Sequence, residues 1–279
     1  MRKLRILRIV LATFAMLGLT LSLLDFTGLA SDYLGWIAKI QFMPSALALS
    51  VWTVLAILAV TFLFGRVYCS VLCPLGILQD IFCFFRRIFG LRFSSAAPLA
   101  GAARTVREVV RMAIAVVFFG GAFLGFHYQW LEPYGIYSRA AQTLLGPLWG
   151  MGNNALAAWA ERTGRYTFYA VEQVAPALCV MAVSAGLLAL IAALAVWRGR
   201  VWCNTICPVG TVLAHVARHA RFKPTIDPAK CVKCGLCAKR CDKGALSVND
   251  DRSIAVDESQ CVSCFDCVGS CRKGALKWR

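Results

Sequence analysis

The sequence predicts two parts of different fold class. Residues 1–222 are expected to form an all-α membrane domain of four transmembrane helices, built as a duplicated two-span unit, and residues 223–279 a small α+β domain. The chain of 279 residues is 59% hydrophobic and has a mean hydropathy of +0.66, which is too apolar for a soluble protein of this size. Its long apolar stretches end at Trp197, and eight of its 14 cysteines lie within about the last fifty residues.

The predicted transmembrane helices follow from length and hydropathy. A helical span needs about 20 apolar residues. Four stretches approach that length: Ile6–Phe26, Pro44–Phe64, Val109–Phe126 and Val174–Trp197. The first stretch, followed by Gly28-Leu29-Ala30, also has features of a cleaved signal peptide. Its apolar core exceeds the usual 7 to 15 residues, which favours a retained anchor.

The distribution of charge predicts the topology. The chain carries a formal net charge of +16, from 30 Lys and Arg against 14 Asp and Glu. Basic residues precede the first span, separate the second from the third and follow the fourth. The first two groups are Arg2, Lys3, Arg5, Arg8, Arg66, Arg86, Arg87, Arg92, Arg104 and Arg107. By the positive-inside rule, both termini and the C-terminal domain are cytoplasmic in a bacterial inner (cytoplasmic) membrane. The charge therefore indicates topology and contact with anionic membrane lipid, and no nucleic-acid partner.

Two cysteine runs in the C-terminal part share one spacing, C-x-x-C-x-x-C-x-x-x-C. They are Cys231, Cys234, Cys237, Cys241 and Cys261, Cys264, Cys267, Cys271. This is the spacing of bacterial two-cluster ferredoxins, in which three cysteines of one run and the fourth of the other hold each [4Fe–4S] cluster. The prediction is cluster 1 on Cys231, Cys234, Cys237 and Cys271, and cluster 2 on Cys261, Cys264, Cys267 and Cys241. Structural zinc and disulfide bonds are the alternatives.

The two runs belong to an internal repeat. Lys243-Gly244-Ala245-Leu246 recurs as Lys273-Gly274-Ala275-Leu276, which predicts a strand–loop–helix unit used twice. The proline that usually follows each fourth cysteine is replaced by Asp242 and Arg272. The turn is therefore expected to be less rigid, with cluster ligation retained.

A second repeat follows the second and fourth spans. Gly65–Gly76 and Gly199–Gly210 share the pattern G-R-V-aromatic-C-x-x-x-C-P-x-G. A duplicated two-span unit gives both copies the same orientation about a pseudo-twofold axis along the membrane normal. Cys69, Cys73, Cys203 and Cys207 are therefore predicted to hold one further metal centre jointly, of iron–sulfur type. Redox thiol pairs and cysteines that merely pack are the alternatives.

Three weaker features concern the rest of the membrane part. Leu75–Phe89 and Val209–Phe222 are amphipathic and are expected to lie at the lipid headgroups. Interfacial helices are expected around Leu144–Arg162 in the outer loop. His127 is a candidate to hydrogen-bond a quinone headgroup, whereas His215 and His219 are interpreted as part of a solvated polar face.

Together these residues resemble the NapH/MauN-type membrane ferredoxins. The four spans, the two C-x-x-x-C-P motifs and the two-cluster ferredoxin domain carry the resemblance, which extends to the membrane half of NosR-type proteins. It implies electron transfer between the quinone pool, or a cytoplasmic donor, and a protein redox partner on the periplasmic or cytoplasmic side. In this interpretation the chain is an electron-transfer component of a quinol dehydrogenase, with quinone as a further cofactor and no catalytic side chain of its own.

The sequence leaves a second class of function open. The chain lacks a nucleotide-binding glycine loop, a CxxCH haem attachment motif and a nucleophile elbow. A conduit for electrons is therefore favoured over a self-sufficient catalyst. The alternative is a redox-sensing or metal-handling accessory protein that assists the assembly or maintenance of a respiratory enzyme.

Overall fold

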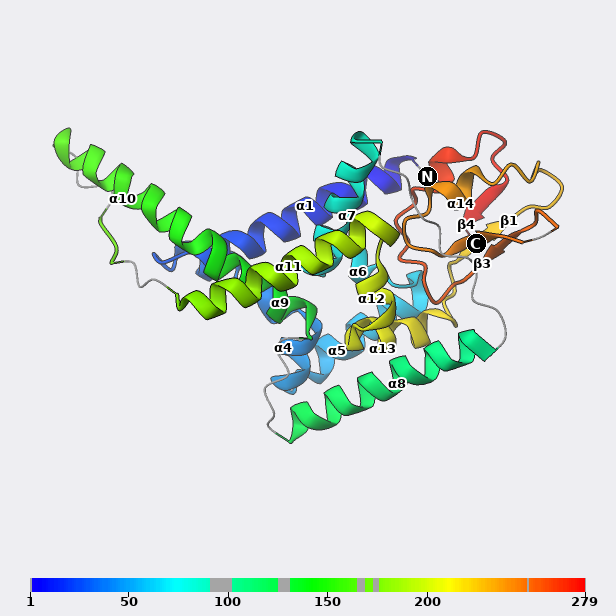
Figure 1. The fold of residues 1–279 in the computed structure, drawn as a ribbon, viewed down its shortest axis with the longest axis horizontal. Coiled ribbons are helices and arrows are strands. Elements are labelled where there is room, and N and C mark those ends of the chain that lie inside the picture. Colours follow the sequence, from blue (N-terminus) through cyan, green and yellow to red (C-terminus); the bar gives the residue numbers. More distant parts are fainter. Residues whose placement is uncertain are drawn as a thin grey trace.

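The computed structural model describes residues 2–90, 102–124, 131–164, 169–172, 176–249 and 251–278. The described part is mostly helical, with a small region of short strands at one end (Figure 1). The helices of the first half are α1 (Arg2–Leu24), α2 (Leu29–Leu34), α3 (Trp36–Lys39), α4 (Phe42–Leu47), α5 (Val51–Phe64), α6 (Tyr68–Val71), α7 (Pro74–Ile88) and α8 (Ala102–Phe123). Those of the second half are α9 (Pro133–Ala140), α10 (Gly146–Arg162), α11 (Leu178–Arg198), α12 (Val201–Thr205), α13 (Pro208–Ala217) and α14 (Leu236–Arg240).

Two of the described helices are long and apolar enough to cross a membrane. They are Lys3–Leu24 within α1, and α11. The predicted span Pro44–Phe64 is divided, because Leu49 adopts a left-handed backbone conformation (φ 52°) between α4 and α5. The predicted span Val109–Phe126 begins inside α8, whose first turns carry Arg107, Glu108 and Arg111. Two spans are therefore supported, and the four-span arrangement stays a prediction.

The helices that follow the C-x-x-x-C-P motifs are more buried than the sequence suggests. Helix α7 packs against α1, α9 and α11, and its Arg86 is only 3% exposed. The expectation that this amphipathic segment lies at the headgroups is therefore wrong for its basic side, which the C-terminal domain covers. The helix expected around Leu144–Arg162 is present as α10, which begins at Gly146 and ends at Arg162. Helix α9 packs into the bundle against α7 and α11, and continues through a π-helical turn (Ala141–Leu145) into α10.

The C-terminal domain contains two small antiparallel sheets. Strand β1 (Pro224–Ile226) pairs with β4 (Leu276–Trp278), and β2 (Leu246–Val248) pairs with β3 (Ile254–Val256). The sheets thus combine strands from both halves of the internal repeat. The first cysteine run leads into α14, whereas the second leads only into a short 3₁₀ turn at Val268–Ser270. The predicted strand–loop–helix unit is accordingly shorter in its second copy.

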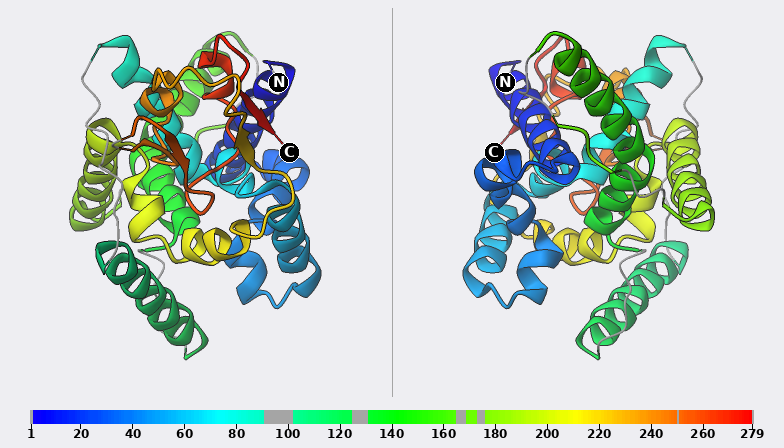
Figure 2. Two further views of the ribbon diagram at one scale, coloured as in Figure 1. Left: turned by 90° about the vertical axis from the view of Figure 1, so that its right-hand side faces the viewer. Right: turned by 90° about the vertical axis from the view of Figure 1, so that its left-hand side faces the viewer.

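The C-terminal domain docks onto the end of the bundle where α5 and α11 finish (Figure 1). The hydroxyl of Ser263 donates a hydrogen bond to the Phe64 carbonyl (2.6 Å), and the amide of Arg200 donates to the Asp242 carbonyl (3.2 Å). The amino terminus lies at the same end, because Arg5 forms an ion pair with Asp266 (2.8 Å). Helix α8 lies on the outside of the bundle (Figure 2), where it packs on α13.

One glycine permits this close docking. Gly199 has φ +74°, and a side-chain carbon at this position would overlap the Asp242 carbonyl oxygen. Gly90 has a similar backbone (φ +64°), but no described atom lies within 4 Å of an added carbon. Alanine substitutions at these two glycines therefore distinguish the energetic cost of a left-handed backbone from the cost of overlap with the Asp242 carbonyl.

We expect Gly199→Ala to loosen the C-terminal domain. Gly90→Ala should cost about 1 kcal/mol through left-handed backbone strain alone, whereas Gly199→Ala should cost about 1 to 3 kcal/mol more through overpacking. Thermal unfolding of the detergent-purified protein and limited proteolysis near residue 222 measure the difference. Equal effects of the two substitutions would contradict the docking described above.

Candidate iron–sulfur sites

One set of four thiols surrounds a single cavity. Cys241 from the first run and Cys261, Cys264 and Cys267 from the second all line it. Apolar side chains, including Val262, Phe265 and Trp278, close the same cavity. We call this group the inner set; it is the set predicted for cluster 2, with its fourth cysteine from the other run. Cys264 also belongs to the apolar core that contains Cys69, Cys73 and Cys207.

The loops between these cysteines have an unusual backbone that is repeated in both runs. Lys233 (φ 53°) and Gly235 (φ 70°) in the first run correspond to Ser263 (φ 52°) and Phe265 (φ 60°) in the second. A left-handed conformation is uncommon for residues with side chains and is found at sites where the structure imposes it. Turns of this kind direct successive amide groups toward one concave side, which suits an anionic group. The loops therefore fit an iron–sulfur cluster.

The other set predicted for a cluster lies farther from the bundle. Cys231, Cys237 and Cys271 are partly exposed and Cys234 is exposed; we call these four the outer set. Burial raises the pKa of Cys237, and the nearby charges of Cys271 and Cys231 raise it further, so these three thiols lie close together. Burial slightly opposes ionisation of Cys271, but backbone amides of residues 273–276 outweigh it and lower the pKa of this thiol. Amide donors to sulfur are one means by which proteins tune such clusters.

Burial raises the pKa of three inner thiols, Cys261, Cys264 and Cys267, which disfavours their thiolate forms before a cluster binds. Burial raises the pKa of Cys261 to about 12, against hydrogen bonding from the Ser263 amide. Burial, reinforced by neighbouring thiols, also raises the pKa of Cys267 well above its ordinary value. Thiolates are the ligands of iron, so binding must release these protons. Within the described ranges, no three His, Cys, Asp or Glu side chains converge closely enough to hold a single metal ion.

The structure also brings together the cysteines of the two C-x-x-x-C-P motifs. Cys69, Cys73, Cys203 and Cys207 are each 3 or 4% exposed. Burial raises the pKa of Cys73 well above its ordinary value, and the charges of Cys203, Cys69 and Cys207 raise it further. Burial likewise raises the pKa of Cys203 to about 11, although Arg200 opposes the shift. Four thiols from the two repeats thus share one buried region, which we call the bundle site.

The shared sequence pattern has a structural reason at each motif. The amide of Gly210 donates a hydrogen bond to the Cys207 sulfur (3.3 Å), and the Gly76 amide acts in the same way on Cys73. A side-chain carbon at Gly76 would overlap the Cys69 carbonyl oxygen, and one at Gly210 would overlap that of Cys203. The glycine after each C-P therefore lets the helix start directly against the first cysteine.

The arginine of each motif reaches across to the other repeat. Arg200 donates to the Cys69 carbonyl (2.8 Å). Arg66 donates to the Gly210 carbonyl (3.2 Å) and to Oδ1 of Asn204 (2.6 Å). Both arginines are almost fully buried. These crossed contacts fix the two motifs against each other around the bundle site.

Two polar residues of α7 were not singled out by the sequence. Gln79 donates a hydrogen bond to the Cys203 sulfur (3.1 Å). Asp80 accepts from Nε of Arg200 (2.9 Å) and also forms ion pairs with Arg8 and Lys243. Burial alone would raise the pKa of Asp80, but these three cations hold it well below its usual range. A polar pair within a mostly apolar helix that ends in two arginines gives no distinguishing signal in the sequence.

A buried carboxyl group lies on another side of the bundle. Glu132, directly before α9, is 5% exposed, and no described residue hydrogen-bonds its Oε1. Burial raises its pKa to about 7, with Arg139 opposing the shift. Its charge in turn acts on Tyr134 and on Tyr68, whose hydroxyl donates to Gln41 (2.8 Å).

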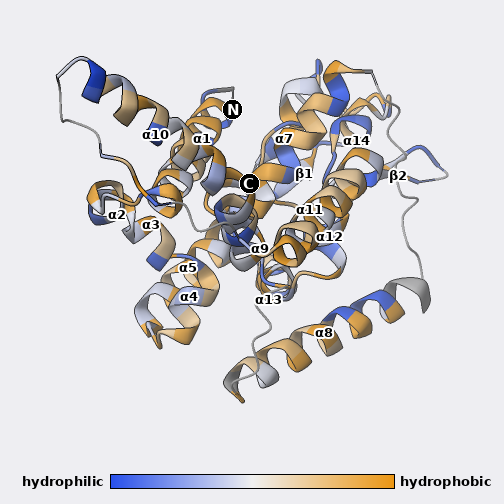
Figure 3. Cartoon of the chain, turned by 60° about the vertical axis from the view of Figure 1, so that its left-hand side comes forward, coloured by the Kyte–Doolittle hydropathy of each residue, from blue (hydrophilic) through white to orange (hydrophobic). Residues whose placement is uncertain are grey.

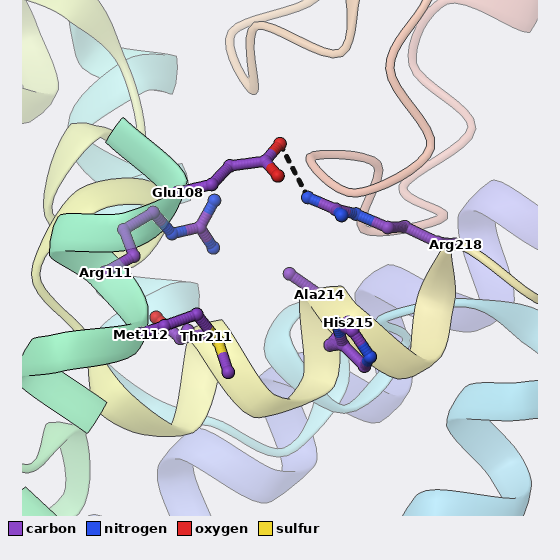
Figure 4. A pocket seen from close by; sticks show the side chains of 7 residues that line it. All are labelled: Glu108, Arg111, Met112, Thr211, Ala214, His215 and Arg218. Carbon is purple, nitrogen blue, oxygen red and sulfur yellow. Dashed lines mark ion pairs between the residues drawn. The ribbon is translucent and has the colours of Figure 1, made fainter. Parts of the chain in front are cut away.

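The histidines contribute little to these sites. His215 and His219 are exposed, with ring centroids 6.2 Å apart. His215 lines a small pocket between α8 and α13, together with Glu108 and Arg218, which form an ion pair of 2.6 Å (Figure 4). His127 lies outside the described residues.

Comparisons with known proteins agree with an iron–sulfur assignment. A family model described as a 4Fe-4S binding domain matches residues 46–92 and again residues 180–226. Each of these matches contains one C-x-x-x-C-P motif. A second model with the same description matches residues 224–247, which contain the first cysteine run.

One curated relative shares a short segment with the chain. An uncharacterized protein of Methanocaldococcus jannaschii is 45% identical over 40 residues, which is 14% of this chain and 16% of the relative. The chain thus spans about a sixth of the relative's length. No solved structure matches the chain. The matched domains and the two ferredoxin motifs make this an iron–sulfur protein of the ferredoxin type that binds [4Fe–4S] clusters.

The crossed assignment of cysteines can be tested by comparing single variants. If inner and outer sets each hold one cluster, Cys241→Ala and Cys264→Ala should leave the same residual EPR signal, because both remove an inner ligand. Cys271→Ala and Cys234→Ala should leave the other signal. Cys179→Ala, at an exposed cysteine outside every motif, should keep all of its iron. A Cys241→Ala spectrum that matches Cys234→Ala would instead indicate one cluster per run.

Glu132 should make stability depend on pH. Its folded pKa of about 7 lies above the ordinary value of 4.5, so its favourable contribution is complete below about pH 4.5 and is lost as the pH rises through 7. Wild-type protein should therefore lose on the order of 2 to 3 kcal/mol relative to Glu132→Gln across this interval. Melting temperatures at pH 5 and pH 8 provide the measurement. Glu161→Gln, at an exposed position of α10, is the control, and a wild-type-like pH difference in Glu132→Gln would refute the assignment.

Proposed function

We propose that this protein is a membrane-bound iron–sulfur electron-transfer protein of the NapH/MauN type, which relays electrons between a quinol and a protein redox partner. The observation that carries the proposal is the succession of three cysteine sites from the exposed end of the C-terminal domain into the bundle. A bound [4Fe–4S] cluster takes up and releases one electron at a time, whereas a quinol gives up two electrons and two protons and the partner is the final acceptor.

The position of the inner set supports this relay. Asn204, next to Cys203, donates a hydrogen bond to the Lys243 carbonyl (2.8 Å), two residues after Cys241. Cys264 shares an apolar core with three cysteines of the bundle site. The two regions are thus joined by direct contacts through protein from which water is largely excluded. Such an arrangement suits electron exchange between neighbouring centres.

We further propose that the bundle site holds a third iron–sulfur centre. Arg66 is buried, and no carboxylate among the described residues lies within ion-pairing distance. Its charge instead acts on Cys69, Cys203 and Cys207. A buried cation without a counter-charge is costly, and four cysteine thiolates on a metal centre would supply that charge. The two matches to a 4Fe-4S binding domain, each with one motif, also favour this proposal.

The surface of the molecule is consistent with a membrane location on one side and a protein partner on the other. Helix α1 exposes Leu7, Phe14 and Leu17, each more than half accessible, and Figure 3 shows largely apolar colouring along α11 and along one half of α8, whose other half is hydrophilic. Around the outer set, basic side chains are exposed: Lys230, Lys233, Lys239, Arg240, Arg272 and Lys273. Such a basic face would steer an acidic redox partner. The amino terminus and the C-terminal domain share one end, as the positive-inside rule requires of two cytoplasmic segments.

Reduction by quinol is the test of this function. The anaerobic protein should develop [4Fe–4S] EPR signals after addition of a short-chain quinol, and dithionite should reduce it fully. Clusters that respond to dithionite but not to quinols of either the benzoquinone or naphthoquinone class would contradict the proposal and favour the accessory-protein alternative.

Removal of one bundle-site cysteine should interrupt the relay. We expect Cys203→Ala to lose about one third of the iron, the share of one cluster among three, and to block reduction by quinol while dithionite still reduces the ferredoxin clusters. Cys83→Ala is the matched control, because Cys83 is also buried but lies outside the motifs. Unchanged iron and unchanged reduction by quinol in Cys203→Ala would rule out the third centre.

A further inference from the structure

A crevice lies between α1 and α7 and ends at the C-terminal domain. Its volume is about 410 Å³, within the range of roughly 300 to 1,000 Å³ that small-molecule sites occupy. We call it the α1–α7 crevice. The pocket between α8 and α13 is smaller, at about 180 Å³.

The lining of the α1–α7 crevice is divided by polarity. Met16 and Leu17 of α1 and Ile81 and Phe84 of α7 contribute apolar walls, while Asp242, Lys243 and Asp266 contribute charged groups from the C-terminal domain. Leu17 and Phe84 are each 58% exposed, so the apolar walls are open to the side. A ligand that fits this division has a long apolar tail and a polar head.

Each charged group at the polar end has a partner of opposite charge, but cations outnumber carboxylates, because Arg86 and Arg200 also pair with Asp242 and Asp80. Four cations and three carboxylates line the crevice, and each cation has a carboxylate partner. The pairs are Arg5–Asp266, Arg8–Asp80, Arg87–Asp242 and Lys243–Asp80. An anionic lipid headgroup would have to compete with these carboxylates for its cations. A neutral head with hydrogen-bonding oxygen atoms could contact these groups without breaking the ion pairs.

The polar end lies beside two of the cysteine sites. Lys243 lines both this crevice and the cavity of the inner set. Asp80 accepts from Arg200, whose guanidinium also donates to the Cys69 carbonyl of the bundle site. A neutral lipid-soluble ligand in this crevice would have its head next to the proposed redox centres. A redox-active head could exchange electrons with them, whereas an inert head could not.

We propose that the α1–α7 crevice binds an isoprenoid quinone or quinol, with its ring near Asp80 and Lys243 and its tail along Ile81 and Leu17. This inference rests on the proposed function, and it adds the location of the site. The hydroxyl groups of a quinol can donate to the carboxylates, and the carbonyl groups of a quinone can accept from the cations, without a change in net charge.

The duplication provides an internal comparison. The pocket between α8 and α13 is lined by the residues of the second repeat that correspond to Ile77, Asp80, Ile81 and Phe84 of α7, which are Thr211, Ala214, His215 and Arg218. Ala214 in place of Asp80 removes the carboxylate that connects to the cysteine sites. Arg218 in place of Phe84 replaces the apolar wall by a charge (Figure 4). The second pocket thus lacks both features on which the assignment depends.

Photolabelling locates the site without reliance on turnover. The full-length protein with its clusters is placed in phosphatidylcholine nanodiscs with an azido-benzoquinone or an azido-naphthoquinone that carries a short isoprenoid tail, and labelled peptides are mapped by mass spectrometry. Label is expected on α1 or α7 and should fall at least tenfold in Thr13→Trp, which fills the crevice from an exposed position of α1. Val10→Trp is the control, because Val10 is exposed on α1 outside the lining.

Further outcomes decide between the alternatives. Ile81→Trp, from the opposite wall, must cause the same loss at wild-type iron content. Label confined to α8 and α13, with quinol reduction of the clusters intact, would overturn the location and leave the proposed function standing. Loss of label when anionic phospholipid is added would assign the crevice to lipid and overturn the inference. Absence of both label and quinol reduction would refute the proposed function itself.

Discussion

The contact on which this structure depends is the set of ion pairs around Asp80. One carboxylate of α7 meets Arg8 from α1, Arg200 from the second C-x-x-x-C-P motif and Lys243 from the C-terminal domain. Removal of one partner from a buried ion pair typically costs about 3 to 5 kcal/mol, and here it would leave three cations facing one another. This side chain connects the first helix, both repeats and the ferredoxin part, and the ion pairs of Asp242 and Asp266 reinforce that connection. Together these contacts place the inner set next to the bundle site.

Duplication explains how such a site could be built from short motifs. Each repeat provides two cysteines, an arginine and a glycine, and neither repeat alone supplies four thiols. Arg66 and Arg200 each cross to the opposite repeat, so the bundle site exists only where the two copies meet. The repeats differ beside it: α7 has Gln79 and Asp80, whereas α13 has Leu213 and Ala214 at the corresponding positions. The polar contacts of one copy and the apolar packing of the other make the two sides of the bundle chemically different.

The sequence makes the candidate cysteine sites easy to predict, because metal ligands recur at fixed spacing and because the two copies of each repeat share one pattern. In the structure Cys241 lines one cavity with Cys261, Cys264 and Cys267, as the spacing predicted. The comparisons independently support [4Fe–4S] clusters. Hydropathy was less informative. It did not predict that Leu49 interrupts the stretch Pro44–Phe64, because the left-handed backbone conformation of one leucine has no signature in an apolar sequence. Nor could it show that α9 enters the bundle with Glu132. The burial of Glu132 and the ion pairs of Asp80 depend on contacts between segments that are distant in the sequence, and a local sequence pattern does not predict such contacts.

The central claim is that three cysteine sites, and not two, hold clusters along one path through the protein. The most direct measurement is the iron and acid-labile sulfide content of the anaerobically purified wild-type protein, with Mössbauer spectra of the same ⁵⁷Fe-enriched sample. The account predicts about twelve irons per chain, four in each of three [4Fe–4S] clusters. About eight irons, with all of the iron in two clusters, would contradict it and leave Cys69, Cys73, Cys203 and Cys207 as thiols.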